Sequence, residues 1–185
     1  MKKTSFADFS CSIARTLDTV GERWTFLILR DVFLGVRRFD DLQRDLGIAR
    51  NVLTERLEAL VEDGVLERRV YHERPVRHEY VLTEKGRDLE SVLFAIMAWG
   101  DRWQSKAGGP PVTLHHEKCA KDTTAKVVCS CCGLPLKSED VTAHAGPGGQ
   151  IAPGTQVVGE LLASGPRRLA HAGGSEGRSD GRAES

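Results

Sequence analysis

Residues 38–82 constrain the fold of this chain most, because two helix patterns and two strand patterns follow one another there with only short connections. The apolar residues of 39–46 and of 49–63 recur at helical spacing, so each segment is predicted to be an amphipathic helix. Residues 65–71 and 76–82 alternate between apolar and polar side chains, which predicts the two strands of a hairpin. Two helices joined by a tight turn and followed by a hairpin are typical of a winged helix-turn-helix fold.

Further helices are predicted on both sides of this segment. Ser10 can cap a short helix that runs to about Val20, and residues 24–34 carry apolar side chains at helical spacing. Thr83 can cap a long helix that continues to about Lys106. The fold class is therefore mainly α-helical with a small β-hairpin as the wing.

The composition allows one moderate core and a small appendage. A chain of 185 residues with 40% hydrophobic side chains is short for two full domains. Lys and Arg number 26, as do Asp and Glu, so the formal net charge is zero. This balance excludes a protein that coats nucleic acid through a bulk positive field. Any binding to nucleic acid must rest on a local basic patch.

Composition also divides the chain into segments. An N-terminal arm, 1–10, precedes the predicted winged helix-turn-helix domain, 11–108. A segment rich in Cys and His follows over 112–142. Residues 146–185 hold ten of the 19 glycines and little apolar content, so we expect this tail to be disordered.

Nothing in the sequence indicates export or a membrane span. Residues 1–8 hold no apolar run like that of a signal peptide, and no segment approaches the ~20 apolar residues that cross a bilayer. Four of the five cysteines lie between positions 119 and 132. An odd number of cysteines in a chain without an export signal suggests metal ligation or a redox thiol rather than a disulfide framework. We therefore expect a cytoplasmic protein without a membrane partner.

The helix predicted over 49–63 has one apolar and one polar face, with Leu53, Leu57 and Leu60 together on the apolar side. In a helix-turn-helix, the first turn of the second helix enters the major groove, where Asn pairs with adenine and Arg with guanine. The candidate base-contacting residues are those of that turn: Arg50, Asn51 and Thr54. Arg56 lies at the edge of the buried face, a position from which its side chain could form either a structural ion pair or a contact with DNA.

The predicted hairpin is rich in basic side chains. Arg68, Arg74 and Arg77 can contact phosphates or the adjacent minor groove, and Arg38 can contact the DNA backbone on the other side. Several such contacts would position the DNA and make binding steeply dependent on salt. The alternative, for the hairpin and for the exposed helix face, is an ordinary solvated surface.

A set of motifs spread over about residues 11–105 resembles the HxlR-type winged helix-turn-helix transcriptional regulators. In chain order the motifs are Cys11-Ser12-Ile13-Ala14-Arg15, Gly21-Glu22-Arg23-Trp24-Thr25, Leu27-Ile28-Leu29-Arg30, Arg38-Phe39, Leu53-Thr54-Glu55-Arg56-Leu57 and Tyr80-Val81-Leu82-Thr83-Glu84-Lys85-Gly86. The resemblance implies a bacterial regulator that binds a double-stranded DNA operator as a homodimer. In it, 49–63 would be the recognition helix and 68–80 the wing.

The resemblance further implies that the outer helices form the dimer. The helix predicted over 83–106 has an apolar stripe broader than one small domain would cover, formed by Leu89, Leu93, Ile96, Trp99 and Trp103. Dimerisation would set two recognition helices roughly 34 Å apart on an inverted repeat. Packing of this helix wholly within its own monomer is the alternative.

The resemblance also points to a small-molecule effector. Some members of the family respond to thiol-reactive molecules through a cysteine near the N-terminus, and Cys11 lies at the corresponding place. Its position in the first turn of a helix, one turn before Arg15, favours a reactive thiolate. Inert packing of the thiol is the alternative, because cysteine is among the most buried residue types.

The segment 112–142 predicts a structural zinc site in a small zinc-ribbon-like knuckle. Its candidate ligands form two pairs, each with two intervening residues: His116 and Cys119, then Cys129 and Cys132. Two such pairs can surround Zn²⁺ tetrahedrally, and the metal would stabilise a segment too short for its own core. His115 can replace His116 and Cys131 can replace Cys132. A redox dithiol and free thiols are the alternatives to zinc.

These patterns favour a sequence-specific DNA-binding transcriptional regulator, most simply a dimeric repressor. An enzyme is not expected, because no carboxylate pair or Ser/His arrangement lies near the cysteines, and a filled metal site leaves little room for substrate. Two alternatives stay open: a winged-helix adaptor for protein partners, and a thiol or zinc redox protein that uses the C-terminal cysteines.

Overall fold

The computed structural model describes residues 5–169, which divide into two units, 5–127 and 128–169. The first unit contains the predicted winged helix-turn-helix domain, and each unit is described by itself below. Among residues 5–169, none of the helices combines the length and the apolar character that crossing a bilayer requires.

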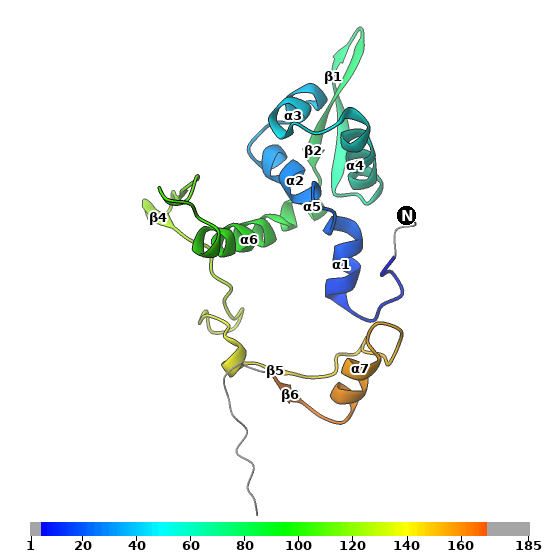
Figure 1. Ribbon diagram of the computed structural model, residues 1–185, viewed down its shortest axis with the longest axis vertical. Coiled ribbons are helices and arrows are strands. Elements are labelled where there is room, and N and C mark those ends of the chain that lie inside the picture. The colour runs from blue at the N-terminus through cyan, green and yellow to red at the C-terminus, as the bar shows by residue number, and fades with distance from the viewer. Residues whose placement is uncertain (1–4, 170–185) are drawn as a thin grey trace, which may run out of the picture. The chain divides into compact units, whose positions relative to one another are not determined.

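The first unit begins with helices in the predicted order (Figure 1): α1 (Ser12–Val20), α2 (Thr25–Phe33), α3 (Phe39–Leu46) and α4 (Arg50–Glu62). Cys11 rather than Ser10 occupies the N-cap position of α1, because the backbone at Cys11 is still extended. The glycines after α3 and α4 are left-handed, with φ of 60° at Gly47 and 66° at Gly64, a conformation that commonly ends a helix. The two helices of the motif are thus separated by the short turn 47–49.

The predicted hairpin is present as β1 (Leu66–Glu73) and β2 (Val76–Leu82), which pair antiparallel. Figure 1 shows its tip projecting beyond α3 and α4. The residues before α3 join this sheet, because Arg38 forms a β-bridge with Glu79 and the amide of Tyr80 donates to the carbonyl of Arg37 at 2.8 Å. The start of α3 is therefore held against the wing.

The core of the first unit lies between α2, α3, α4 and the base of the hairpin. Its buried members are Ile28, Leu29, Val32, Leu42, Ile48, Leu53, Leu57, Leu60, Val65 and Leu66. The three leucines of α4 are no more than 1% exposed, which confirms the predicted buried face. Each fully buried leucine stabilises the fold by roughly 1.5–3 kcal/mol, so this face fixes the rotation of α4 about its axis.

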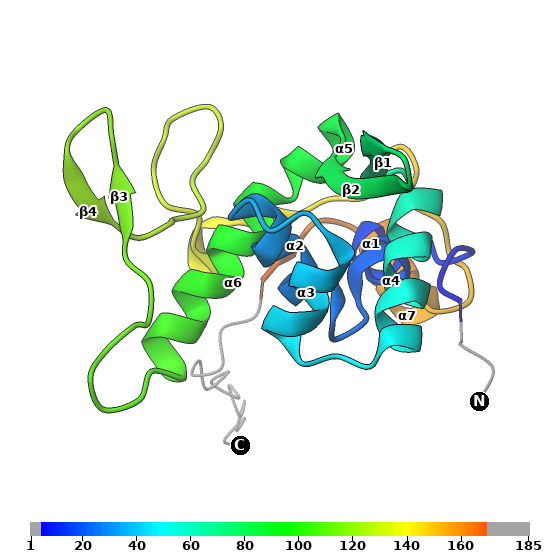
Figure 2. The ribbon, with the colours of Figure 1, turned by 90° about the horizontal axis from the view of Figure 1, so that it is seen from above.

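The long helix predicted over 83–106 is wrong in one respect: it is two helices, α5 (Glu84–Asp88) and α6 (Glu90–Trp103), interrupted at Leu89. Thr83 caps α5 as predicted, and its hydroxyl also donates to the carbonyl of Gly64 at 2.6 Å. A Cβ at Gly86 would lie 2.1 Å from the carbonyl oxygen of Val65. α5 is thus held against the start of the hairpin, whereas α6 contacts α2 (Figure 2).

A short hairpin, β3 (Leu114–His116) and β4 (Lys121–Thr123), follows α6 within the first unit. The second unit contains the 3₁₀ turn η1 (Ser138–Asp140), β5 (Thr142–Ala143), α7 (Gln156–Ala163) and β6 (Arg167–Arg168), with β5 paired to β6. The boundary between the units falls after Val127, inside the segment that the sequence groups as 112–142.

α7 corrects the disorder predicted for 146–185 over part of its length. Four apolar residues recur there at helical spacing: Val157, Val158, Leu161 and Leu162. The amide of Gly159 donates to the carbonyl of Thr155, which is buried. Residues 170–185 of the predicted tail lie outside the described residues.

Candidate nucleic-acid interface

The first turn of α4 presents two of the three predicted base-contacting residues to solvent. The side chain of Arg50 is 71% exposed, and Asn51 is exposed as well. Thr54 is half-buried, and its hydroxyl donates to the carbonyl of Arg50 at 2.9 Å. Arg50 and Asn51 therefore have their polar groups directed outward, while the hydroxyl of Thr54 is already bonded within the helix.

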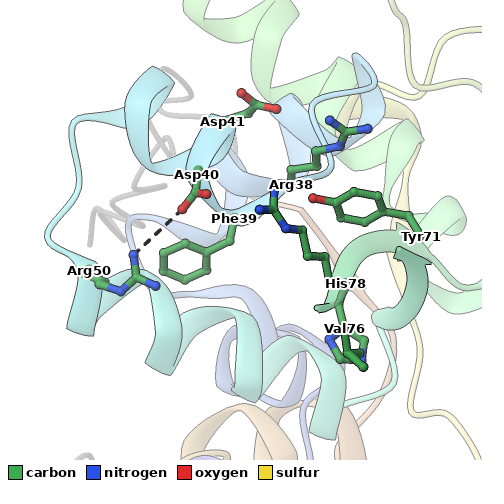
Figure 3. Close-up of a pocket in the computed structure, with 9 residues that line it drawn as sticks. Arg38, Phe39, Asp40, Asp41, Arg50, Tyr71, Val76 and His78 are labelled. Carbon is green, nitrogen blue, oxygen red and sulfur yellow. Dashed lines mark ion pairs between the residues drawn. The ribbon is translucent and has the colours of Figure 1, made fainter. Parts of the chain in front are cut away.

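A pocket of about 540 Å³ lies between this turn and the hairpin (Figure 3). Its lining residues are Arg38, Phe39, Asp40, Asp41, Arg50, Tyr71, Val76, Arg77 and His78. Three predicted DNA-contacting arginines thus meet from three parts of the chain. The expectation that Arg38 acts on the other side is corrected, because its β-bridge to Glu79 places it beside the hairpin.

Aromatic rings and one carboxylate orient the cations of this pocket. The guanidinium carbon of Arg38 lies 4.4 Å from the centre of the Tyr71 ring, and that of Arg50 lies 4.6 Å from the centre of the Phe39 ring. Nη1 of Arg50 is 3.8 Å from Oδ1 of Asp40, the pair joined by a dashed line in Figure 3. Exposed ion pairs contribute little, so Arg50 can exchange Asp40 for a base or a phosphate at small cost.

The other predicted arginines are exposed along the hairpin, outside the pocket lining. Arg68 and Arg74 are both exposed. Burial raises the pKa of the nearby Tyr80, while the charge of Arg68 lowers it by less and Glu58 adds a smaller rise. Tyr80 is therefore a neutral hydrogen-bonding group at the junction of α4 and the wing.

Two residues that the sequence left with alternatives have defined surroundings. The side chain of Arg56 is 14% exposed and forms an ion pair with Glu55, which favours its structural role. Cys11 is half-buried at the N-cap of α1, one position before the first turn in which the sequence placed it.

Tyr71 and Phe39 are the residues of this surface that sequence reasoning missed as functional. They contact two arginines through their rings, although the helical spacing of 39–46 marks Phe39 only as one of the apolar residues of an amphipathic helix. Asp40 was missed too. An acidic residue in the first turn of a helix is ordinary helix chemistry, so only the three-dimensional contact with Arg50 marks it.

The four predicted metal ligands occur as two turns, one in each unit. In the first, Nδ1 of His116 lies 3.2 Å from the sulfur of Cys119. In the second, hydrogen bonds from the backbone at Cys132 and Cys131 lower the pKa of the Cys129 thiol. Within residues 5–169, no group of three or more His, Cys, Asp or Glu side chains is placed to hold a metal ion. Zinc binding stays a prediction.

Known proteins resemble this chain in sequence. The HxlR-like helix-turn-helix family model matches residues 19–107. The HTH-type transcriptional regulator Rv3095 of Mycobacterium tuberculosis is 47% identical over 137 residues, which cover 74% of this chain and 87% of Rv3095. YtcD of Bacillus subtilis, also named an HTH-type transcriptional regulator, is 33% identical over 115 residues, covering 62% of this chain and 91% of YtcD.

Solved structures resemble it too. PA1607, described as a candidate transcription factor, has a TM-score of 0.67 and 39% identity, over 75% of this chain and 96% of PA1607. PA1374 from Pseudomonas aeruginosa, described in the same way, has a TM-score of 0.53 and 45% identity, over 74% of this chain and 93% of its own. A match that covers 137 of 185 residues cannot end before position 137. The similarity to Rv3095 therefore extends past Cys132, the last cysteine of the chain.

Proposed function

The chain belongs to the HxlR-like helix-turn-helix family of transcriptional regulators, and on that premise we propose that it is a dimeric repressor that binds an inverted-repeat operator. One observation carries the proposal: Arg38, Arg50 and Arg77 meet at one pocket beside the exposed first turn of α4. In a chain with zero net charge, such a local cluster is what DNA binding requires.

In this proposal the first turn of α4 enters the major groove. Arg50 would pair with guanine through two hydrogen bonds and Asn51 with adenine, while Thr54 would contact a base through its methyl group. Arg38, Arg68, Arg74 and Arg77 would lie along the phosphates and set the position of α4. The rings of Tyr71 and Phe39 support this arrangement, because they restrict where two of the guanidinium groups can move.

A second copy of the chain is the proposed partner of α6. This helix, which the structure describes in full, buries none of its residues. Trp99 and Trp103 are 60% and 61% exposed, and Ile96 is 45% exposed. An apolar pocket of about 230 Å³ lies alongside, between α2 and α6, with Phe26, Leu27, Leu34 and Leu93 among its lining residues. Exposed apolar surface of this extent supports association through α6, which would pair two recognition helices.

The proposed effector is a thiol-reactive small molecule that acts at Cys11. The half-buried thiol stands at the start of α1, where a bulky adduct would disturb the packing of that helix. We expect Cys11→Ser to abolish any oxidant-induced release of the operator, measured by mobility shift. An unchanged response in that variant would remove Cys11 from the proposal. As a regulator of bacterial genes, the protein would act in the cytoplasm, where the DNA is.

The test of operator binding uses the double variant Arg50→Ala/Asn51→Ala. An inverted repeat in the DNA beside the gene supplies the probe, and fluorescence anisotropy measures affinity against a scrambled sequence. Each base contact contributes roughly 1–3 kcal/mol, so affinity for the operator should fall by about 30-fold or more. Affinity for the scrambled DNA should change much less.

The control is Arg44→Ala. Arg44 is an exposed arginine of α3 that pairs with Asp41 at 2.7 Å and does not line the pocket. The substitution Arg44→Ala removes a positive charge from the same helix-turn-helix motif but leaves Arg50 and Asn51 unchanged. Unchanged operator affinity in the double variant, or an equal loss in the control, would contradict base contact by this turn.

A further inference from the structure

The apolar pocket of about 230 Å³ in the first unit is formed by side chains from α2, from α6 and from the segment 112–114. Ten of its eleven lining residues are apolar, and the eleventh is Arg30. Six of the lining residues are half-buried: Phe26, Phe33, Leu93, Phe94, Met97 and Leu114. All of these side chains come from one copy of the chain, so the pocket exists without a second copy.

The pocket and the proposed contact surface for a second copy lie on different faces of α6. At 3.6 residues per turn, the exposed apolar residues of this helix share one face: Val92, Ile96, Trp99 and Trp103. Leu93, Phe94 and Met97, which line the pocket, lie on a neighbouring face. Within α6, which the structure describes in full, Ile96 alone belongs to both sets. A second copy can therefore cover the exposed face while the pocket stays available.

The charges at the pocket favour a neutral ligand. Nε of Arg30 donates to Oδ1 of Asp31 at 2.7 Å, and its Nη2 donates to Oδ2 of Asp45 at 3.2 Å. Two carboxylates thus bind the one cation of the lining, so little positive charge is left for an anionic ligand. Among residues 5–169, no carboxylate lines the pocket and would pair with a cationic one. A charged ligand would lose its hydration in these apolar surroundings without gaining a partner.

The volume of the pocket sets the size of the ligand. An apolar cavity of about 150 Å³ stays dry and binds benzene, because water finds no hydrogen-bond partners in it. The pocket beside α6 has about 230 Å³ and the same kind of lining, so it suits a molecule of one or two rings. Phe26, Phe33 and Phe94 favour an aromatic ligand further, because rings stabilise one another in edge-to-face and offset contacts.

Arg30 connects the pocket to the helix-turn-helix. It lines the pocket from α2, and Asp45, which accepts its hydrogen bond, lies in the last turn of α3. Leu34, another lining residue, is closely followed in the chain by Arg38, which forms the bridge to the wing. A ligand that displaces α2 or Arg30 therefore acts on the position of α3, the helix before the proposed recognition helix.

We propose that this pocket binds a neutral molecule of one or two aromatic rings, and that its occupancy changes operator affinity through α2 and Arg30. The first step, binding of the molecule, requires no DNA. The second step rests on the proposed function. The site is separate from the proposed thiol site, because Cys11 does not line the pocket and the ligand forms no covalent bond.

Isothermal titration calorimetry of the full-length protein with indole tests the first step. Indole is a neutral molecule of two fused rings, and we expect saturable binding of about one molecule per chain. Indole-3-carboxylate adds a negative charge to the same rings, so it should bind at least about 10-fold more weakly. No saturation up to about 1 mM indole, or equal affinities for the two compounds, would overturn the proposal. This comparison uses the wild-type chain alone, so it does not depend on any variant folding.

Leu93→Trp and Val92→Trp form a matched pair of neighbouring substitutions on α6. The larger ring at position 93 should fill the pocket and weaken indole binding at least about 10-fold. Val92→Trp should keep the wild-type affinity, because Val92 lies on the exposed face outside the lining. Circular dichroism checks that both variants are folded. Binding lost in Val92→Trp and kept in Leu93→Trp would place the site on the exposed face and contradict the proposal.

Sedimentation equilibrium distinguishes the ligand from a second copy as the occupant of the pocket. Because the two are assigned to different faces of α6, saturating indole should leave the dimer dissociation constant within about 3-fold of its value without indole. A dissociation constant that keeps rising with the indole concentration would mean that a second copy fills the pocket, and it would overturn the proposal.

Fluorescence anisotropy of the operator, with and without saturating indole, tests the second step. Operator affinity of the wild type should change at least about 5-fold, the lower end for coupling between two sites, and that of Leu93→Trp should not change. Equal affinities of the wild type under the two conditions would overturn the second step. Absence of operator binding under both conditions would instead contradict the proposed function, which the calorimetry does not use.

Discussion

Helices α4 and α6 are of similar length, 13 and 14 residues, but they use their apolar side chains in opposite ways. The leucines of α4 are buried within one copy of the chain, and its opposite face carries exposed polar residues such as Asn51 and Glu58. α6 is the more apolar helix, yet the structure, which describes all of it, shows none of its residues buried. Within one copy of the chain, the apolar face of α4 is therefore covered by other residues, whereas the apolar side chains of α6 stay partly exposed to solvent.

Because of this difference, substitutions in α4 and in α6 should affect different quantities: the free energy of unfolding for α4, and the association of two copies for α6. Changes on the buried face of α4 should alter the free energy of unfolding of each copy, because that face is part of the core. Changes on the exposed face of α6 should leave the single copy intact and alter association instead. If the protein binds DNA as the proposed dimer, operator affinity should depend on both, since two recognition helices must then be positioned together.

The largest effect is expected from Leu57→Ala on α4. Leu57 has no exposed surface, so its truncation leaves a cavity in the core and should lower the free energy of unfolding by about 2–5 kcal/mol. Urea denaturation followed by circular dichroism measures this change. The neighbouring Glu58→Ala, at an exposed position, should change stability by no more than about 0.5 kcal/mol. Similar midpoints for the two variants would mean that this face is not the core.

The next effect is expected from Ile96→Asp on α6. A carboxylate on the proposed contact surface would be buried without a partner in the dimer, so association should weaken at least about 10-fold. Sedimentation equilibrium measures the dimer dissociation constant, and operator affinity should fall with it. Ser91→Asp introduces the same charge at an exposed polar position of α6 and serves as the control. A dimer that persists unchanged in Ile96→Asp would place the interface elsewhere.

A smaller effect is expected from Arg77→Ala in the wing. Arg77 lines the pocket beside α4 and is assigned to a phosphate, so its loss should weaken specific and non-specific DNA binding about equally. The slope of log affinity against log salt should become shallower by about one unit per copy. Arg69→Ala is the control, because Arg69 is paired with Glu67 at 2.9 Å. A loss confined to the operator sequence would instead assign Arg77 to a base.

Most of the winged helix-turn-helix could be predicted from the sequence because its signals are local. The bounds of α3 agree with the apolar spacing of 39–46, and the glycines that follow α3 and α4 have the conformation that ends a helix. The predictions that needed correction depend on distant contacts. No periodicity reveals the break at Leu89 or the close approach of Gly86 to Val65, where an added Cβ would lie 2.1 Å from the carbonyl oxygen.

The candidate site shows the same division. The exposure of Asn51 on the first turn of α4 could be predicted, because this residue lies opposite the apolar stripe of that helix, and the contact of Arg50 and Asn51 with DNA stays a prediction. Tyr71 could not, since its contact with Arg38 joins residues far apart in the chain. The helix α7 was missed for a different reason: the many glycines of 146–185 lower the average apolar content and hide a short run of helical spacing.

The smallest effect is expected at Asp31 of α2, a buried carboxyl in the core of the single copy. Asp31 is 2% exposed and accepts a hydrogen bond from Nε of Arg30 at 2.7 Å, while its Oδ2 has no hydrogen-bond partner among residues 5–169. The pKa of this carboxyl is raised, chiefly by burial and to a smaller extent by Asp45, against the lowering effect of Arg30. Because the folded protein holds the proton more tightly than the unfolded chain, Asp31 contributes stability at low pH that is lost as the pH rises through the raised pKa.

Asp31→Asn should remove that pH dependence and raise the free energy of unfolding at neutral pH, by about 0.5–1 kcal/mol. Urea denaturation of the variant and the wild type at several pH values between about 4 and 8 measures both effects. Asp88→Asn, at an exposed position, should leave the wild-type profile unchanged. If Asp31→Asn instead destabilises the protein at neutral pH, the ionised pair with Arg30 contributes more than its burial costs. The core of the single copy would then depend on that pair as well as on the leucines of α4.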